Sequence, residues 1–465
     1  MKGAARQICI LSGERCREAQ KCFAPFAHVN SLGFQASSNN RNSRRCKKSG
    51  GTKERKDMAE SYVQKLLADR IGGNRFGKRE NKNHLEQAKQ TYVESTNQGL
   101  LDLSREEPDA MADFDVIGSL GYEAGQWGNR ERAENGILEF CEAAAAYLQR
   151  EFKVEGLNPQ TEIAHAIGTR SALSQLALAL INPGDVLLNA DLRENSLAAT
   201  TKWLGGEVFS LPLLPENKFL PDLESVPAEV LAKAKLLYIS YPNDPTGAVA
   251  GKAFFKKVVK FAKANQLAVV HDAGLAALTY DQTEPLSFLT IPGAKQVGVE
   301  IHSLSKAFNM TGWRLAFAAG NAKLIQAFAA VKAVTDAGQF KAIQRAGITA
   351  LNKPEITAGT KAKYERRLQN LSEVFAEMGF AAKKPQAGYF LYLPIPKAAG
   401  DGVKFKKAAD FAEYLLQKTG VIVSPQDQAG AFIRVSAAFQ ALEAEEYGVY
   451  EEIRRRCQDL GLLFK

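Results

Sequence analysis

The sequence lacks any apolar run that approaches the roughly 20 residues a helix needs to cross a bilayer. Lys, Asp, Asn or Gly interrupts each candidate, as Asn182 does after the run 176–181. We therefore expect no membrane-spanning segment. The composition, 45% hydrophobic and 24% charged over 465 residues, is typical of a globular chain with two or three domains.

Cysteine is scarce, and its spacing excludes the common zinc sites. Four of the six cysteines lie close to the N-terminus, without a nearby His pair: Cys9, Cys16, Cys22 and Cys46. Their spacing fits no zinc template. Cys141 and Cys457 fall in helical patterns and are interpreted as packing residues. We expect no metal site and a reducing compartment.

Most of the chain carries almost no net charge. The net charge is +9, but residues 1–56 hold 13 Lys or Arg against three Glu, and the other 409 residues hold 47 against 48 acidic residues. The basic, acid-poor segment also carries runs of Ser, Asn and Arg, which favours a cleaved transit peptide. A disordered basic arm that binds a polyanion and a mispredicted gene start are the alternatives.

Internal repeats are absent too, and from Met58 onward helical periodicity alternates with short aliphatic runs. This pattern predicts an α/β fold, with parallel strands covered by helices on both faces. Strands are expected over 185–189, 207–211, 236–240, 267–272, 298–303 and 314–318. Helices are expected over 138–152, 171–181, 252–265 and 322–334.

After residue 352 the pattern changes to one long amphipathic helix over 355–378, followed by strands over 389–393, 421–424 and 432–437. These elements predict a second, smaller α+β domain. The expected division is an extension over 1–57, an N-terminal arm with part of the small domain over 58–110, a large domain over 111–335 and the small domain over 336–465.

Three segments carry most of the functional information: Tyr241-Pro-Asn-Asp-Pro-Thr-Gly247, Val269-Val-His-Asp-Ala273, and His302-Ser-Leu-Ser-Lys306 leading into Met310-Thr-Gly-Trp-Arg314. Taken singly, they are a turn, a helix-capping aspartate and a surface lysine. Taken together, Asp272 and Lys306 fall at or near the carboxyl ends of predicted parallel strands, where open α/β sheets bind their ligands.

In this order and spacing, the segments resemble the class I/II aminotransferases of fold type I, over about residues 58–465. Within that family, the stretches 211–223 and 297–320 are similar to the LL-diaminopimelate aminotransferase group. The resemblance implies a mainly parallel sheet in a large domain and a smaller α+β domain. It also implies the cofactor pyridoxal 5'-phosphate (PLP), amino acid and 2-oxo acid substrates, and a homodimer.

The resemblance implies a role for each matching residue. Lys306 would be catalytic, forming the Schiff base with PLP and then moving the α-proton. Asp272 would keep the pyridine nitrogen protonated. Arg434 would grip the substrate α-carboxylate, unless it is an ordinary strand arginine that faces solvent. The residues matching the phosphate-binding positions are Gly168, Thr169, Arg170, Ser303, Ser305 and Arg314.

The departures from the family cluster around the expected cofactor. Asp244 and Leu275 stand where the family has an Asn and a Tyr that bind the phenolic oxygen. Ungapped alignment puts Glu194 at the ring-stacking aromatic position, and Arg132 at a tyrosine that reaches the phosphate of the neighbouring subunit. Ser104-Arg-Glu106 replaces a Gly-x-Gly near the expected substrate carboxylate.

These departures keep three hypotheses in view. The first is a PLP-dependent aminotransferase, and the second is a catalytically impaired or repurposed relative with the same fold. The third is a polyanion-binding protein acting through residues 1–56. For the first two we expect no nucleic acid or membrane partner. The expected compartment is a plastid or another organelle if the extension is a transit peptide, and the cytoplasm otherwise.

Overall fold

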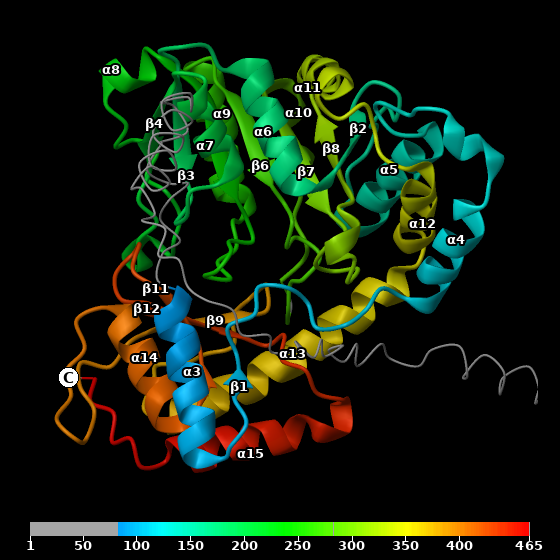
Figure 1. Ribbon diagram of the computed structural model, residues 1–465. Helices are drawn as coiled ribbons and strands as arrows, with labels where there is room; N and C mark the ends of the chain where they lie inside the picture. The colour runs from blue at the N-terminus through cyan, green and yellow to red at the C-terminus, as the bar shows by residue number, and fades with distance from the viewer. Residues whose placement is uncertain (1–81, 282, 465) are drawn as a thin grey trace, which may run out of the picture. The chain divides into compact units, whose positions relative to one another are not determined.

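The computed structural model of the chain describes residues 82–281 and 283–464 (Figure 1). The basic extension lies outside the described residues, together with its four cysteines and its proposed targeting role. No helix of the described part is long and apolar enough to cross a membrane. Cys141 and Cys457 are buried in helices, which confirms their interpretation as packing residues.

A seven-stranded sheet in the order β2-β8-β7-β6-β5-β3-β4 forms the large core (Figure 1). Its strands are β2 (Ile163–Ala166), β3 (Val186–Ala190), β4 (Glu207–Ser210), β5 (Ala234–Ser240), β6 (Ala268–Asp272), β7 (Gly298–Ser303) and β8 (Ala316–Gly320). Neighbours from β4 to β7 pair in parallel. The sheet is therefore mainly parallel, as predicted.

The far edge of this sheet corrects the sequence analysis in two ways. The strand expected over 314–318 begins at Ala316 and runs antiparallel to β7, because the connection between them holds only the short 3-10 helix η5 (Thr311–Trp313) and no crossover helix. The edge strand β2, which pairs with β8, is absent from the sequence prediction. Its four residues are too few for a clear periodic signal.

Helices cover both faces of the sheet, since buried side chains alternate along β5. Leu236 and Tyr238 belong to one core cluster, and Leu237 and Ile239 to the other. The first cluster includes residues of α6 (Gly168–Leu180), α7 (Ser196–Trp203) and α11 (Ala322–Thr335). The second includes residues of α5 (Leu138–Phe152), α9 (Lys252–Ala264) and α10 (Ala294–Val297). The short helix α8 (Ala228–Leu231) leads into β5.

The C-terminal elements build a smaller three-stranded antiparallel sheet in the order β11-β12-β9. Its strands are β9 (Phe390–Pro394), β11 (Ser424–Gln426) and β12 (Phe432–Ser436). The helices of this part are α13 (Pro354–Glu377), α14 (Ala408–Thr419) and α15 (Glu446–Cys457). The expected α+β pattern of this region is therefore present.

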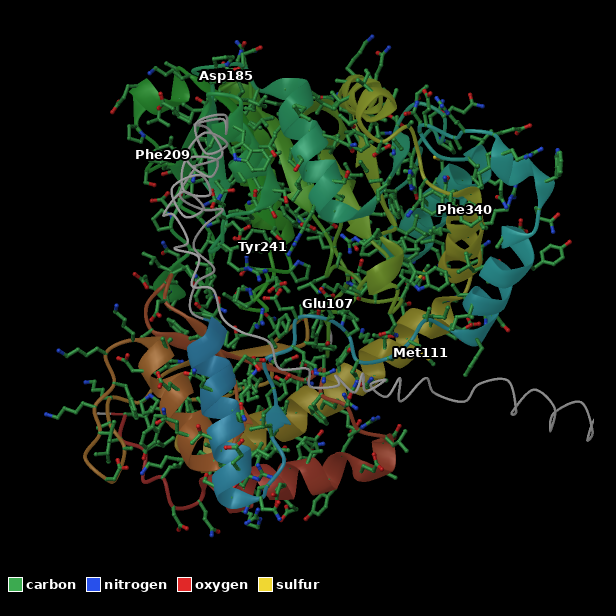
Figure 2. All side chains as sticks on the ribbon, in the orientation of Figure 1. Glu107, Met111, Asp185, Phe209, Tyr241 and Phe340 are labelled. Atoms are coloured by element: carbon green, nitrogen blue, oxygen red, sulfur yellow. The ribbon has the colours of Figure 1, made fainter. Side chains whose placement is uncertain are left out.

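Residues near 100 join this smaller sheet region. The two-residue strand β1 (Leu101–Asp102) pairs in parallel with β10 (Val421–Ile422), and α3 (Lys82–Thr96) packs against α14. Farther along, α12 (Lys341–Leu351) packs against α4 (Phe114–Ala124) and α5. The connection between β1 and α4 includes Glu107, which is labelled in Figure 2. The domain boundaries proposed from the sequence stay a prediction.

Candidate active site

A cavity of about 810 Å³ lies at the carboxyl ends of the central strands. Ser240, Asp272 and Ser303, which end β5, β6 and β7, all line it. Its walls bring together most of the residues singled out in the sequence: Thr169, Arg170, Glu194, Asp244, Asp272, Leu275, Ser303, Ser305, Lys306 and Arg314. Ligands bind at this edge of open α/β sheets.

One end of the cavity is built to hold an anion. Helix α6 begins at Gly168, where the preceding Ile167 makes no side-chain cap bond, so the first amides of the helix lack a side-chain cap. Gly168 has φ +76°, and a Cβ there would lie 2.5 Å from Nη2 of Arg314. The glycine is therefore required by both the backbone and the neighbouring guanidinium.

Arg314 is held in place by its own turn rather than by a strand. It follows η5 with φ +56°, and its Nη1 donates to Thr311 O at 3.0 Å. Ser303 Oγ accepts a hydrogen bond from Ser305 N at 3.1 Å, which shapes the loop after β7. A guanidinium, hydroxyl groups and the start of a helix thus converge on one place, which suits a phosphate group.

Asp272 presents a carboxylate at the end of β6. Gly274 N donates to its Oδ1 at 3.0 Å. Burial raises the pKa of Asp272 to about 6, and the nearby carboxylates Asp191 and Asp244 act in the same direction. A cationic ligand beside Asp272 would reverse this shift, because an opposite charge favours the ionised form.

Lys306 extends into the cavity from the loop that follows β7. Its Nζ donates to Glu106 O at 2.8 Å and lies 3.1 Å from Glu107 Oε2. The same ammonium group lies 5.7 Å from the ring centroid of Tyr389. The amine is therefore in contact with the segment between β1 and α4.

Arg434 lies behind Glu106 rather than on the cavity wall. It belongs to β12, and only 1% of its surface is exposed, so the alternative of a strand arginine facing solvent is wrong. Its Nη1 bonds Glu106 Oε1 at 3.0 Å, and its Nη2 donates to Ser104 O at 2.8 Å. Glu106 lines the cavity and Arg434 does not.

Arg193 is a cavity residue that sequence reasoning missed. Its Nη2 lies 3.1 Å from Asp244 Oδ1, and its Nη1 lies 3.6 Å from Glu106 Oε1. The ungapped alignment singled out the next residue, Glu194, whose carboxylate accepts a hydrogen bond from Lys202 at 2.8 Å. Asp244 is the feature of the sequence that could have indicated such a residue, because a carboxylate in a pocket needs a cation to offset its charge.

Arg132 is a predicted site residue that does not line this cavity, and nothing in the described structure connects it to the cavity as Glu106 connects Arg434. It is exposed, in the loop after the 3-10 helix η2 (Trp127–Arg130). The resemblance assigned it to the phosphate site of a neighbouring subunit, so its role stays a prediction.

The sheet and the cavity at its strand ends define an α/β fold with a ligand-binding site, and comparison with known proteins identifies the family. Residues 125–447 match the family Aminotransferase class I and II. The chain belongs to this family and is a transaminase, which confirms the predicted fold class.

Relatives match along most of the chain. It is 46% identical to an LL-diaminopimelate aminotransferase of Methanocaldococcus jannaschii and 44% identical to one of Methanococcus maripaludis, in both cases over 87% of this chain and 100% of the relative. The substrate-bound BacF structure from Bacillus subtilis matches with a TM-score of 0.74 and 31% identity, over 86% of this chain and 98% of that one. These matches favour the aminotransferase over an impaired or repurposed relative.

Proposed function

We propose that the protein uses PLP to transfer an amino group between an amino acid and a 2-oxo acid, with LL-diaminopimelate as the amino donor. The observation that carries this proposal is that an anion cradle, a raised-pKa aspartate and a lysine share one cavity. When bound, PLP supplies the electron sink that stabilises charge at the substrate α-carbon.

The residues present fit this cofactor. The start of α6 and the groups around it, which include Thr169, Ser303 and Arg314, would hold the phosphate. Asp272 would pair with the protonated pyridine nitrogen, and this cationic partner would lower the raised pKa of its carboxyl. Lys306 would attach PLP covalently and carry the α-proton. Two features fit less well, because Asp244 is a carboxylate and Leu275 is not a donor.

The substrate side supports an amino acid with charges at both ends. Arg434 offers a planar fork suited to an α-carboxylate. Arg193 adds a second guanidinium, and Glu106, Glu107 and Asp244 add carboxylates. LL-Diaminopimelate carries two ammonium and two carboxylate groups, and it is the substrate in the names of the relatives aligned over their full length.

The test begins with the cofactor. The full chain, purified with PLP, should show the absorption band of PLP bound to a lysine, and borohydride reduction with peptide mapping should find the label on Lys306. Lys306→Ala should lose the label, and Lys341→Ala, which removes a lysine outside the cavity, should keep it. Label on another lysine would overturn the assignment.

The substrate is tested separately. Wild-type protein mixed with LL-diaminopimelate and 2-oxoglutarate should form glutamate, whereas meso-diaminopimelate should react more slowly. Equal or faster reaction with an unrelated amino acid would reject the proposed donor while leaving the cofactor assignment intact.

The assembly and the compartment complete the proposal. We expect a homodimer, with Arg132 of each subunit serving the phosphate site of the other, and organelle import directed by residues 1–57. Arg132→Ala should weaken PLP binding only in the dimer, which analytical ultracentrifugation with PLP titration checks. A fluorescent protein fused after residue 57 should enter an organelle if the extension is a transit peptide, and stay in the cytoplasm otherwise.

A further inference from the structure

The segment 104–107 stands between the cavity and Arg434. Its backbone is held in place, because Ser104 N and Oγ both donate to Asp102 Oδ1, at 3.0 and 2.6 Å, and Tyr389 Oη donates to Glu106 O at 2.7 Å. From this fixed backbone, Glu106 directs its carboxylate to Arg434 and Glu107 directs its own to Lys306. Each acidic side chain thus has its own cation.

Glu106 gives Arg434 the type of contact that a substrate carboxylate would give. The guanidinium is buried, so it needs an anion to offset the loss of hydration. Its Nη1 donates to Glu106 Oε1 and its Nη2 donates to Ser104 O. Its Nε has no hydrogen-bond partner among the described residues. A substrate carboxylate would have to displace Glu106 to reach this fork.

Glu106 also has a second cation within reach. Arg193 Nη1 lies 3.6 Å from the same Oε1 atom that pairs with Arg434. The Glu106 side chain is 52% exposed, so it has room to turn about its own bonds on the cavity surface. Burial acts to raise the pKa of Glu106, but Arg434, Arg193 and Lys306 together lower it below its usual value, and the carboxylate is charged at neutral pH.

We propose that Glu106 is an internal competitor for the substrate carboxylate: it pairs with Arg434 in the empty cavity and turns to Arg193 when substrate enters. The inference rests on the proposed function of Arg434 as the carboxylate-binding arginine. Binding then exchanges one carboxylate for another on Arg434, so the net gain in affinity is smaller than for an open arginine. Glu106 therefore limits the affinity for carboxylate substrates.

The probe for this competition is heptanedioate, a dicarboxylate that has no amine and so cannot react. Its dissociation constant is measured by titration calorimetry with the PLP-loaded full chain. Glu106→Gln should bind heptanedioate on the order of tenfold more tightly than wild type, since the competing charge is gone. Glu106→Asp keeps the charge and should bind more weakly than Glu106→Gln.

Glu107→Gln is the matched control. It removes one negative charge from the same segment, but that carboxylate faces Lys306 and not Arg434. The change in heptanedioate affinity should therefore be much smaller than in Glu106→Gln. Equal tightening in the two variants would mean that general charge, and not competition for Arg434, sets the affinity, and it would overturn the proposal.

Arg434→Ala separates this inference from the proposed function. If heptanedioate binding is lost in Arg434→Ala and tightened in Glu106→Gln, both stand. If it is lost in Arg434→Ala but unchanged in Glu106→Gln, the competitor role fails and the role of Arg434 stands. If Arg434→Ala binds heptanedioate like wild type, the carboxylate role of Arg434 fails, and the competitor role fails with it.

Two further measurements distinguish competition from a structural role. In steady-state kinetics, Glu106→Gln should lower the KM for the amino donor, whereas a loosened fold would lower kcat without lowering the KM. Arg193→Leu should weaken heptanedioate binding more in wild type than in the Glu106→Gln background, because only wild type has a displaced carboxylate that needs Arg193. Equal weakening in both backgrounds would overturn the second position of Glu106.

Discussion

The two ends of the cavity differ in how their charges are arranged. At the phosphate end, Gly168, Ser303 and Arg314 offer donors. At the substrate end, charges of opposite sign alternate from Asp244 through Arg193 and Glu106 to Arg434. The phosphate end follows the family pattern, and the substrate end is made from pairs that the pattern does not contain. Anchoring of the cofactor and selection of the substrate can therefore diverge independently in one cavity.

The largest effect is expected from replacing Lys306, the residue between the two ends of the cavity. Lys306→Ala should lower the transamination rate by roughly 10²- to 10⁴-fold, the range that a positioned proton-transfer group contributes. Stopped-flow or coupled assays of glutamate formation would measure it. Retention of the wild-type rate would show that another group moves the proton and that Lys306 is not the catalytic residue.

The second effect concerns Asp272, the carboxylate that ends β6 and lines the cavity. The folded-state pKa of Asp272, about 6, lies above its ordinary value of 3.8, so its ionisation disfavours the folded state. In the cofactor-free protein, this penalty is absent well below the ordinary pKa of 3.8, grows as the pH rises from 3.8 towards 6, and is complete above about pH 7. Asp272→Asn should remove it and raise the free energy of unfolding by about 2 to 3 kcal/mol at pH 7.

Chemical unfolding of both proteins at pH 4, 5, 6 and 7 would check this prediction. Asp459→Asn, which removes an exposed carboxyl far along the chain, serves as the control for loss of one charge. Adding PLP should reverse the order and make wild type the more stable protein, since the paired carboxylate is then favourable. If the advantage of Asp272→Asn is the same at all four pH values, ionisation of the Asp272 carboxyl is not its cause.

The third effect is expected from a change at the phosphate end of the cavity alone. Gly168→Ala should weaken PLP binding by about 1 to 2 kcal/mol beyond any loss of stability, because the new Cβ would displace the Arg314 guanidinium. Gly156→Ala is a matched control, since Gly156 also has positive φ, at +64°, but has open space around its Cβ position. Fluorescence titration with PLP measures both. Equal effects would show that backbone strain, and not Arg314, is responsible.

The smallest effect sharpens the contrast at the substrate end. Asp244→Asn with Leu275→Tyr should lower the apparent pKa of the lysine-bound PLP band by less than about 1 unit, since Arg193 already offsets part of the Asp244 charge. Arg193→Leu should raise the same pKa. A spectroscopic pH titration compares the three proteins. If the double variant titrates like wild type, residues 244 and 275 do not face the phenolic oxygen.

The local sequence is enough to predict elements whose signal lies within one stretch of chain. The helix expected over 138–152 and the strand expected over 298–303 have the bounds found for α5 and β7. Helical periodicity and uninterrupted aliphatic runs are local properties. The helix expected over 171–181 is present as α6, which begins three residues earlier, at Gly168. Asp272 ends β6 and Lys306 follows β7 by three residues, as predicted.

Contacts between distant segments could not be predicted in this way. Glu106 and Arg434 are 328 residues apart in the chain, and no local pattern states that one covers the other. Arg193 was missed for the same reason. The buried Glu300, which pairs with His271 at 2.9 Å and His302 at 2.5 Å, is a further case, since a charged residue in a strand is expected to face solvent.

The sequence by itself determined the alternating α/β architecture, the family resemblance and the residues of the phosphate end, because each depends on short motifs and on their order along the chain. Only the tertiary structure decided that β8 runs antiparallel, that Arg434 is buried, and that Glu106 occupies it. Chain direction, burial and ion pairing depend on which remote segments meet in space, and that is a property of the whole fold rather than of any one segment.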